Sequence, residues 1–196
     1  REEYNKILQR DIGDYILKAC KHDKGSSYDV AKVIHEMYKD SFVCVSIKDS
    51  VWFYYNTKIN RWERDDKGIT LRQQISTSIY QEFSKMQRTK QAASLESDDE
   101  NGRLSAKIFK VMQRLKETSF KSNLMTECAE LFYDKDKSFL DKLDSYNHLL
   151  GCQNGVYDLT KNVFRKGRPE DYISRTTKVD YIEYDPKSEE IKEIEQ

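Results

Sequence analysis

Two clusters of basic side chains could neutralise phosphate groups. The first lies in residues 103–121, where six Lys and Arg side chains stand against one acidic side chain. Four of these cations, Arg103, Lys107, Lys110 and Arg114, are spaced by four, three and four positions, which places them on one face of a helix. Such a row can lie along a nucleic-acid backbone and contact phosphates without reading bases. It is equally typical of a solvated helix face, and for a single helix that interpretation is simpler.

The second cluster lies in residues 161–178, where six basic side chains stand against two acidic ones. Tyr157, Phe164 and Tyr172 interleave with these charges. Aromatic rings beside cations on short strands suit single-stranded nucleic acid, through base stacking and backbone neutralisation. The same rings could instead be core residues covered by Arg stems. The candidate DNA contacts from both clusters are Arg103, Lys107, Lys110, Arg114, Lys121, Arg165, Lys166, Arg168 and Arg175.

Sequence signatures of catalysis are absent. The chain has no GxxxxGK[ST] phosphate loop, no GxGxxG, no HExxH and no GxSxG. The acidic pairs Asp65–Asp66 and Asp98–Asp99 fall in turn-like segments, where solvated loop charges are the simplest interpretation. The four cysteines are scattered without a CxxC pair, so reduced thiols are expected rather than a metal site. We therefore expect no catalytic residue, no metal ligand and no cofactor in this chain itself.

Composition indicates a folded protein with a polar surface. The chain has 196 residues, of which 35% are charged and 12% aromatic, and this aromatic content argues against disorder. Lys plus Arg equals Asp plus Glu at 34 each, so nucleic-acid binding would have to come from local patches. No apolar run approaches the roughly 18 residues of a membrane span, so no membrane partner is expected.

Hydrophobic periodicity positions both clusters on an α+β fold. We predict a helix-rich body with a small antiparallel β-meander and a short C-terminal β element. Alternating, aromatic-rich runs predict the meander, in which Trp52 and Trp62 could face each other across the second hairpin. Apolar residues at helical spacing predict the helices. The expected strands are 42–47, 51–56 and 61–66, and the expected longer helices are 70–94, 103–118 and 123–133, with a helix capped by Ser27 before the meander.

The last third of the chain carries a family resemblance. The segment "LLGCQNGVYDLTKNVFRKGRPEDYIS" resembles the domain that precedes the superfamily 3 helicase in primase–helicases of large DNA viruses and related phages. These viruses include poxviruses, asfarviruses, iridoviruses and mimiviruses. The upstream "YDVAKVIHEMYKDSFVCVSIKDSVWFYYNTKINRWERDD" resembles the opening of the same domain, a helix followed by a strand and a hairpin with two tryptophans. The resemblance runs from about Tyr28 to Tyr184 and covers most of the chain.

The resemblance implies a domain that links a primase to a motor. Residues 1–184 would form this collar domain, with a possible flexible loop at 95–102, and residues 185–196 would begin the connection to a downstream AAA+ helicase. The implied roles are oligomer contacts in a hexameric ring and guidance of single-stranded or forked DNA to the motor. ATP and Mg²⁺ would serve the parent helicase, and the host cytoplasm would be the place of replication. The motif residues, expected to determine the fold, are Trp52, Trp62, Asn154, Gly155, Asp158, Pro169 and Tyr172.

Two other functions stay open at this point. The domain could be a purely structural collar whose charges make contacts between subunits and never meet DNA. It could also be a fragment of a nucleotidyl transferase, which would need its carboxylates on a rigid strand edge facing one cavity. The absence of catalytic signatures places this enzyme last.

Overall fold

The chain divides into two units that are discontinuous in sequence. The first comprises Arg1–Tyr54 and Glu63–Leu140, and the second comprises Tyr55–Trp62 and Asp141–Gln196. The computed structural model describes residues 12–21, 25–96 and 99–185. Among these residues, none of the helices has the length and apolarity needed to cross a membrane. The span predicted as one linking domain therefore contains two units, which share the hairpin between Tyr54 and Glu63.

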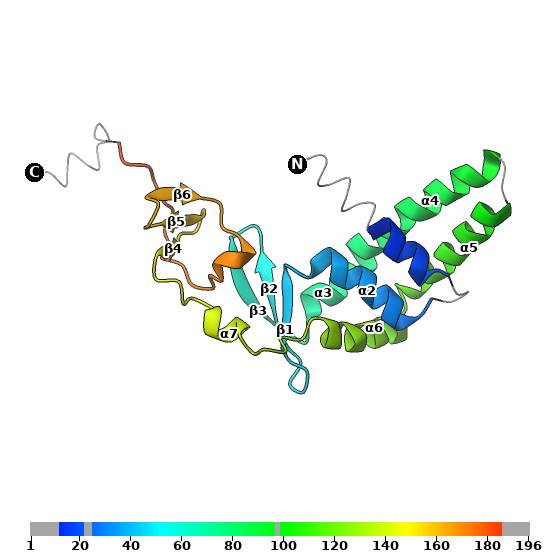
Figure 1. Ribbon diagram of the computed structural model, residues 1–196, viewed down its shortest axis with the longest axis horizontal. Coiled ribbons are helices and arrows are strands. Elements are labelled where there is room, and N and C mark those ends of the chain that lie inside the picture. Colours follow the sequence, from blue (N-terminus) through cyan, green and yellow to red (C-terminus); the bar gives the residue numbers. More distant parts are fainter. Residues whose placement is uncertain (1–11, 22–24, 97–98, 186–196) are drawn as a thin grey trace, which may run out of the picture. The chain divides into compact units, whose positions relative to one another are not determined.

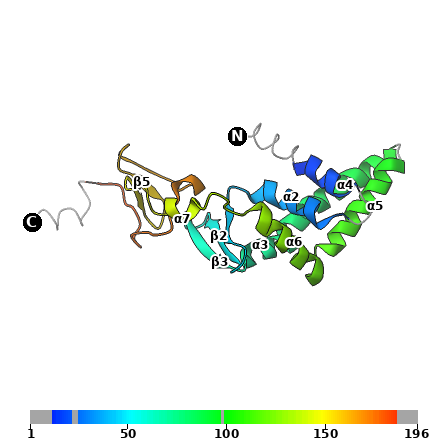
Figure 2. The ribbon, with the colours of Figure 1, turned by 60° about the horizontal axis from the view of Figure 1, so that its bottom comes forward.

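Helices dominate the first unit. Helix α2 (Ser27–Tyr38) begins where Ser26, and not Ser27 as predicted, accepts a hydrogen bond from the Asp29 N–H at 3.0 Å. Val30, Val33 and Ile34 form its buried face. This face packs beside α6 (Thr118–Leu131), and Figures 1 and 2 show the two helices side by side. A helix over residues 12–19 precedes α2.

The long helix predicted at 70–94 is present but contains an irregular turn. It runs as α3 (Ile69–Gln74), the π-helical turn η1 (Ile75–Ile79) and α4 (Tyr80–Glu96). Helix α5 (Asp99–Arg114) lies against α4, as both ribbon views show. The two helices occupy most of the span expected as a flexible loop at 95–102, so only residues 97–98 lie outside the described part there.

A polar seam joins α4 to α5. The Ser105 side chain is buried and receives a hydrogen bond from Gln87 Nε2 at 3.0 Å. Its hydroxyl in turn donates to Gln91 Oε1 at 2.8 Å. Below this seam, Ile108 and Val111 enter the shared core. The apolar stripe of α5 is therefore buried, and the opposite face of α5 carries the basic row.

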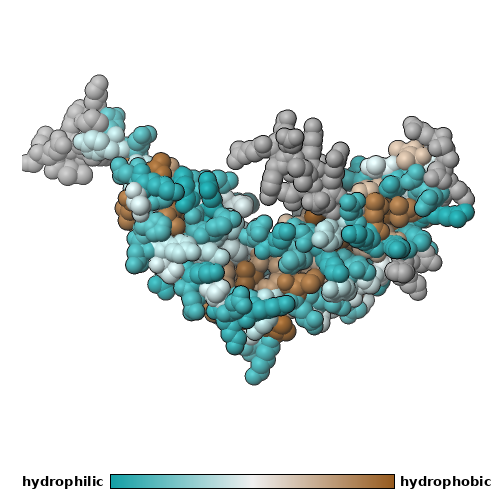
Figure 3. Space-filling model, in the orientation of Figure 1, coloured by the Kyte–Doolittle hydropathy of each residue, from teal (hydrophilic) through white to brown (hydrophobic). Residues whose placement is uncertain are grey.

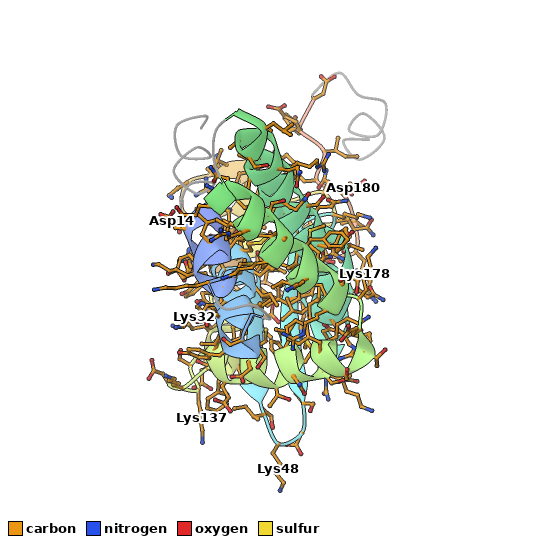
Figure 4. The ribbon with its side chains drawn as sticks, turned by 90° about the vertical axis from the view of Figure 1, so that its right-hand side faces the viewer. Asp14, Lys32, Lys48, Lys137, Lys178 and Asp180 are labelled. Atoms are coloured by element: carbon orange, nitrogen blue, oxygen red, sulfur yellow. The ribbon has the colours of Figure 1, made fainter. Side chains whose placement is uncertain are left out.

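The predicted meander forms nearly as expected. Strands β1 (Phe42–Ser46), β2 (Val51–Asn56) and β3 (Arg61–Asp66) form a sheet in the order β1-β2-β3. Strands β1 and β2 are antiparallel. Figure 4 shows Lys48 at the tip of the turn between them, pointing away from the unit.

The two tryptophans serve different cores. Trp52 lies in the first unit with its ring centroid 5.8 Å from that of Phe132. Trp62 belongs to the second unit and meets Tyr55 edge-on at 5.7 Å. The predicted cross-strand pairing of Trp52 with Trp62 is therefore replaced by burial of each ring in the core of its own unit.

The second unit contains the expected terminal β element. The short helix α7 (Phe139–Lys142) leads into strands β4 (Leu149–Gly151), β5 (Val156–Asp158) and β6 (Val163–Arg165), and a 3₁₀ turn η2 (Pro169–Asp171) follows. The three strands form an antiparallel sheet in sequence order. The helices together with the two small antiparallel sheets confirm the predicted α+β class.

The hairpin tip completes the second unit. The indole Nε1 of Trp62 donates to the Pro169 carbonyl at 2.8 Å, and its backbone N–H donates to the Ile173 carbonyl at 2.7 Å. Tyr55 and Trp62 are both buried. Figure 3 shows apolar side chains at the surface over the β4–β6 sheet. Leu150 and Val163 of this sheet are each 44% exposed, and the strand register puts them on opposite faces.

Candidate nucleic-acid interface

Two members of the basic row on α5 hold the fold together. Lys107 Nζ donates to the Lys21 carbonyl at 3.1 Å, and Arg114 Nη1 donates to the Gly25 carbonyl at 2.9 Å. The Arg114 guanidinium also lies 3.7 Å from the centre of the Phe120 ring, a cation–π contact. These cations fasten the connection before α2 to α5. Their charge is therefore partly engaged by the protein itself.

The other candidate contacts of the first unit differ in exposure. Arg103 and Lys110 are exposed on α5, and Lys121 is half-buried on α6. The four cations of the row do lie on one helix, but their exposure alternates. Lys107 and Arg114 are half-buried, whereas Arg103 and Lys110 are exposed. Nearby, Lys116 lies 4.2 Å from the centre of the Tyr80 ring. The first unit thus offers a smaller cationic surface than its sequence indicates.

The second cluster is divided by an ion pair. The Arg165 guanidinium donates to both carboxylate oxygens of Asp171, at 2.8 and 2.7 Å. Asp171 is buried and also accepts the Arg168 backbone N–H at 2.8 Å. The hydrogen bonds that Arg165 donates to Asp171 raise the pKa of Arg165. This bidentate pair closes the chain between β6 and η2, so Arg165 is a structural cation here.

Three of the candidate DNA contacts in this cluster are exposed. Lys166 and Arg168 flank Gly167 on the connection after β6, and Arg175 follows η2. Arg175 is 90% exposed and approaches Asp144 only at 3.8 Å. With their charged ends in solvent, these side chains can reach phosphate oxygens without breaking a buried contact.

The aromatic rings of the cluster stack on one another. The β4–β6 register puts Leu150, Tyr157 and Phe164 in one cross-strand row. The Tyr181 ring stacks on Phe164 with centroids 4.5 Å apart and planes at 16°, and it lies 5.2 Å from Tyr157. These rings are all half-buried. Much of the surface of these rings is therefore covered by other side chains, as the alternative interpretation of core aromatics predicted.

The tyrosine after η2 has a separate environment. Tyr172 has a left-handed backbone with φ of 50°. Its ring meets that of Tyr146 edge-on at 6.1 Å, and Lys142 Nζ lies 5.6 Å from its centre. The preceding Pro169 takes the first position of the 3₁₀ turn, where proline's fixed φ fits. These motif residues shape the turn that holds Asp171.

The "NGVYDL" motif organises turns and close contacts. Asp158 caps the β5–β6 turn by accepting the N–H groups of Thr160 and Lys161, each at 3.1 Å. At Gly155 a Cβ atom would come within 2.6 Å of both the Arg165 carbonyl and the Phe164 ring. The position therefore excludes every side chain.

Asn154 in the same motif binds the chain that leaves the sheet. Its Nδ2 donates to the Tyr181 carbonyl, and its Oδ1 accepts the Tyr181 N–H, both at 2.9 Å. The sequence placed Asn154 in a turn, but its side chain works across 27 positions. No local pattern could have identified this partner.

The adjacent carboxylates of β3, Asp65 and Asp66, differ in burial and in their partners. Asp65 is buried and accepts the Thr70 N–H at 2.9 Å, and burial raises its pKa. Asp66 is exposed and pairs with Arg64 at 2.9 Å. The pair Asp98–Asp99 lies outside the residues whose side chains are described. Two carboxylates arranged in this way do not share a cavity for metal-assisted transfer.

The cysteines are free and buried. Burial raises the pKa of Cys20 to about 12 and that of Cys44 to about 11, and it also raises the pKa of Cys128. Protonated thiols are poor nucleophiles and poor metal ligands. Across residues 12–21, 25–96 and 99–185, no group of three or more His, Cys, Asp or Glu side chains is arranged to hold a metal ion.

The sequence interpretation missed Asp144 and Asp171. Asp144 accepts the N–H groups of Ser174 and Arg175 at 2.7 and 3.1 Å, and also the Ser174 hydroxyl. It lines a 310 Å³ pocket in the second unit together with Leu150 and Ile173. The "RPED" signal could have suggested a cap formed by Asp171, three residues after Arg168. Asp144 carries no such signal, because its partners lie 30 positions away.

Comparison with known proteins identifies relatives of the chain. A protein of Acanthamoeba polyphaga mimivirus, named as a candidate helicase, is 36% identical over 175 residues, which cover 87% of this chain and 18% of the relative. A protein of Frog virus 3 with the same kind of name is 28% identical over 199 residues, covering 84% of this chain and 20% of the relative. The chain thus spans about one fifth of the length of these relatives.

A family model described as "D5 N terminal like" matches residues 31–196. The match crosses both units and includes the motif segment as well as the meander. The resemblance predicted from these segments is confirmed. The chain belongs to the D5 N-terminal-like family, whose members occur in helicase-named proteins of large DNA viruses.

Proposed function

We propose that this chain is a non-catalytic DNA-contacting and assembly module of a viral replicative primase–helicase. The observation that carries the proposal is family membership, together with relatives that are named as helicases and are about five times longer. By this proposal, ATP and Mg²⁺ act in a motor segment of the parent protein, and hexameric assembly and replication in the host cytoplasm belong to that parent.

The exposed cations are the proposed DNA contacts. Lys110 on α5 and the trio Lys166, Arg168 and Arg175 in the second unit present charge to solvent. Lys107, Arg114 and Arg165 already bind protein groups, so their part would be to support the surface. Because phosphate contacts are independent of sequence, we expect weak binding of single-stranded DNA with little base preference.

Fluorescence anisotropy with a labelled single strand tests this proposal. Four phosphate contacts would make the logarithm of affinity fall with the logarithm of salt with a slope of about 3. Reversal of Lys110, Lys166, Arg168 and Arg175 to Glu should abolish binding. Lys48→Glu is the matched control for each of the four reversals made singly, because Lys48 lies at the tip of the β1–β2 turn and its reversal changes the charge by the same amount. Tight, salt-insensitive binding would contradict the proposal.

A structural collar is the second candidate. The specific observation in its favour is the pair of apolar side chains that flank the β5–β6 turn, where Leu159 and Val163 are 57% and 44% exposed. Exposed apolar clusters of this kind often mark contacts between proteins. Leu159→Lys with Val163→Lys should then lower self-association of the parent protein, measured by sedimentation, while DNA affinity stays unchanged.

A further inference from the structure

The segment 177–181 follows the β4–β6 sheet as if it were a further strand. The Thr177 N–H donates to the Gly151 carbonyl at 2.8 Å, and the Gln153 N–H donates to the Val179 carbonyl at 3.0 Å. These bonds continue the edge of β4 past its last residue. Residues 177–181 nevertheless do not form a regular strand.

Side-chain amides replace the missing ladder bonds. Gln153 Nε2 donates to the Lys178 carbonyl at 2.5 Å. Asn154 makes both a donor and an acceptor bond to the backbone of Tyr181, which is the pattern of a paired strand residue made by a side chain. The Tyr181 ring then stacks on Phe164. One asparagine and one ring thus secure the far end of the segment.

Tyr181 is the last residue of the segment and makes its ring contacts. The next three residues are exposed, and Ile182 and Tyr184 are exposed by 84% and 65%. Val179, within the segment, is itself 62% exposed. The segment therefore buries little beyond the Tyr181 ring, and few contacts oppose its opening.

We propose that residues 177–181 form a releasable strap, with Asn154 as the positioning residue that fixes where the chain leaves the sheet. In the docked state the outgoing chain starts at Tyr181. In the released state it starts at about Thr176, which adds five residues and up to about 17 Å of reach. Docking or release of the strap thereby sets the length of chain between the sheet and the residues after Tyr181. This inference does not depend on DNA binding, and the two can fail separately.

Amide hydrogen exchange of the whole chain tests the strap. In Asn154→Ala, exchange at the Tyr181 N–H should rise at least about tenfold, because that N–H loses its acceptor and the strap opens more often. The Thr177 N–H should exchange faster too, since the strap opens as a unit. The amides of the β5 strand should keep their protection. Asn147→Ala is the matched control, because Asn147 is an exposed asparagine of the same unit.

Unchanged exchange at Tyr181 in Asn154→Ala would overturn the proposal. Equal loss of protection in the strap and in β5 would also overturn it, because the strap would then be no separate unit of opening. A second pair of variants examines the ring. Tyr181→Ala should release the strap, whereas Tyr181→Phe should keep it docked, since stacking on Phe164 needs the ring alone.

Trypsin provides an independent readout. Figure 4 shows Lys178 at the surface, so its side chain is accessible while its backbone is held through Gln153. Proteolysis needs the backbone to open locally. Cleavage after Lys178 should therefore be roughly tenfold faster in Asn154→Ala than in the wild-type chain, and no faster in Asn147→Ala. Equal rates in all three proteins would contradict release of the strap.

Discussion

The two basic clusters differ in what their half-buried cations bind. In the first unit, Lys107 and Arg114 donate to backbone carbonyls of the connection before α2. In the second unit, Arg165 is paired with the buried carboxylate of Asp171. The first arrangement adds bonds to neutral acceptors near solvent, whereas the second desolvates two charges that depend on each other. The number of basic residues in a segment therefore shows neither how many of them face solvent nor how much each stabilises the fold.

The largest expected effect concerns the ion pair. Asp171→Ala leaves the half-buried Arg165 guanidinium without its partner and frees the Arg168 N–H. The free energy of unfolding should fall by about 3 kcal/mol. Urea denaturation followed by tryptophan fluorescence measures it, since Trp62 lies in this unit. Asp180→Ala, an exposed carboxylate, is the control, and an equal loss in both variants would show that the pair has no special weight.

Loss of the arginine in the first unit should cost less. Arg114→Met removes the hydrogen bond to Gly25 and the contact with Phe120, while its apolar stem is kept. We expect a loss of about 2 kcal/mol in thermal or urea unfolding. Lys110→Met on the same helix should change stability by less than about 0.5 kcal/mol. If the two substitutions lower the free energy of unfolding equally, the distinction between structural and solvent-exposed cations in the basic row is wrong.

A smaller effect of opposite sign is expected at Tyr55. Its hydroxyl is buried without a hydrogen-bond partner among the described residues, and burial raises its pKa to about 12. Tyr55→Phe should therefore stabilise the protein by up to about 1 kcal/mol, because an unsatisfied polar group is removed. Differential scanning calorimetry would show the rise in Tm. A clear destabilisation would show that the hydroxyl does have a hydrogen-bond partner. Tyr55 would then no longer differ from the cations whose hydrogen bonds are satisfied.

The smallest effect depends on pH. Burial alone would raise the pKa of Asp158, but the Lys161 N–H, the Lys161 ammonium and the Thr160 N–H lower it overall. The carboxylate is thus favoured in the folded state, so its stabilising contribution is present above the unfolded pKa of about 4 and is lost as pH falls through the folded pKa. The difference in Tm between wild type and Asp158→Asn should shrink between pH 7 and pH 3. A constant difference would contradict it.

Local patterns predicted the elements well. Alternation in "VWFYYN" and helical spacing from Leu71 to Met86 placed β2 and the α3–α4 rod within a few residues. The π-helical turn at Ile75–Ile79 was not predictable, since its residues keep the apolar spacing of an ordinary helix. These signals reside in neighbouring residues, where burial alternates with the period of the element.

The candidate site was predicted less well, because its contacts are long-range. The spacing of Arg103, Lys107, Lys110 and Arg114 correctly gives one helix face. Whether a cation on that face meets solvent or a carbonyl depends on a connection about 90 positions earlier. The same holds for Asn154, whose partner lies 27 positions later. A sequence shows which groups can bond, whereas the fold decides which of them do.

The recruitment of a hairpin tip into the second unit also constrains the order of folding. The Trp62–Pro169 hydrogen bond spans 107 positions, so the second core lacks its indole until the two segments meet. During synthesis at about 5–20 residues per second, Tyr55 and Trp62 emerge several seconds before η2 exists. During that interval these two aromatic side chains lack their partners in the second core, and closing so long a loop is slow. The first unit should therefore gain its native contacts early on the ribosome, and the second should follow only after the last third of the chain has been made.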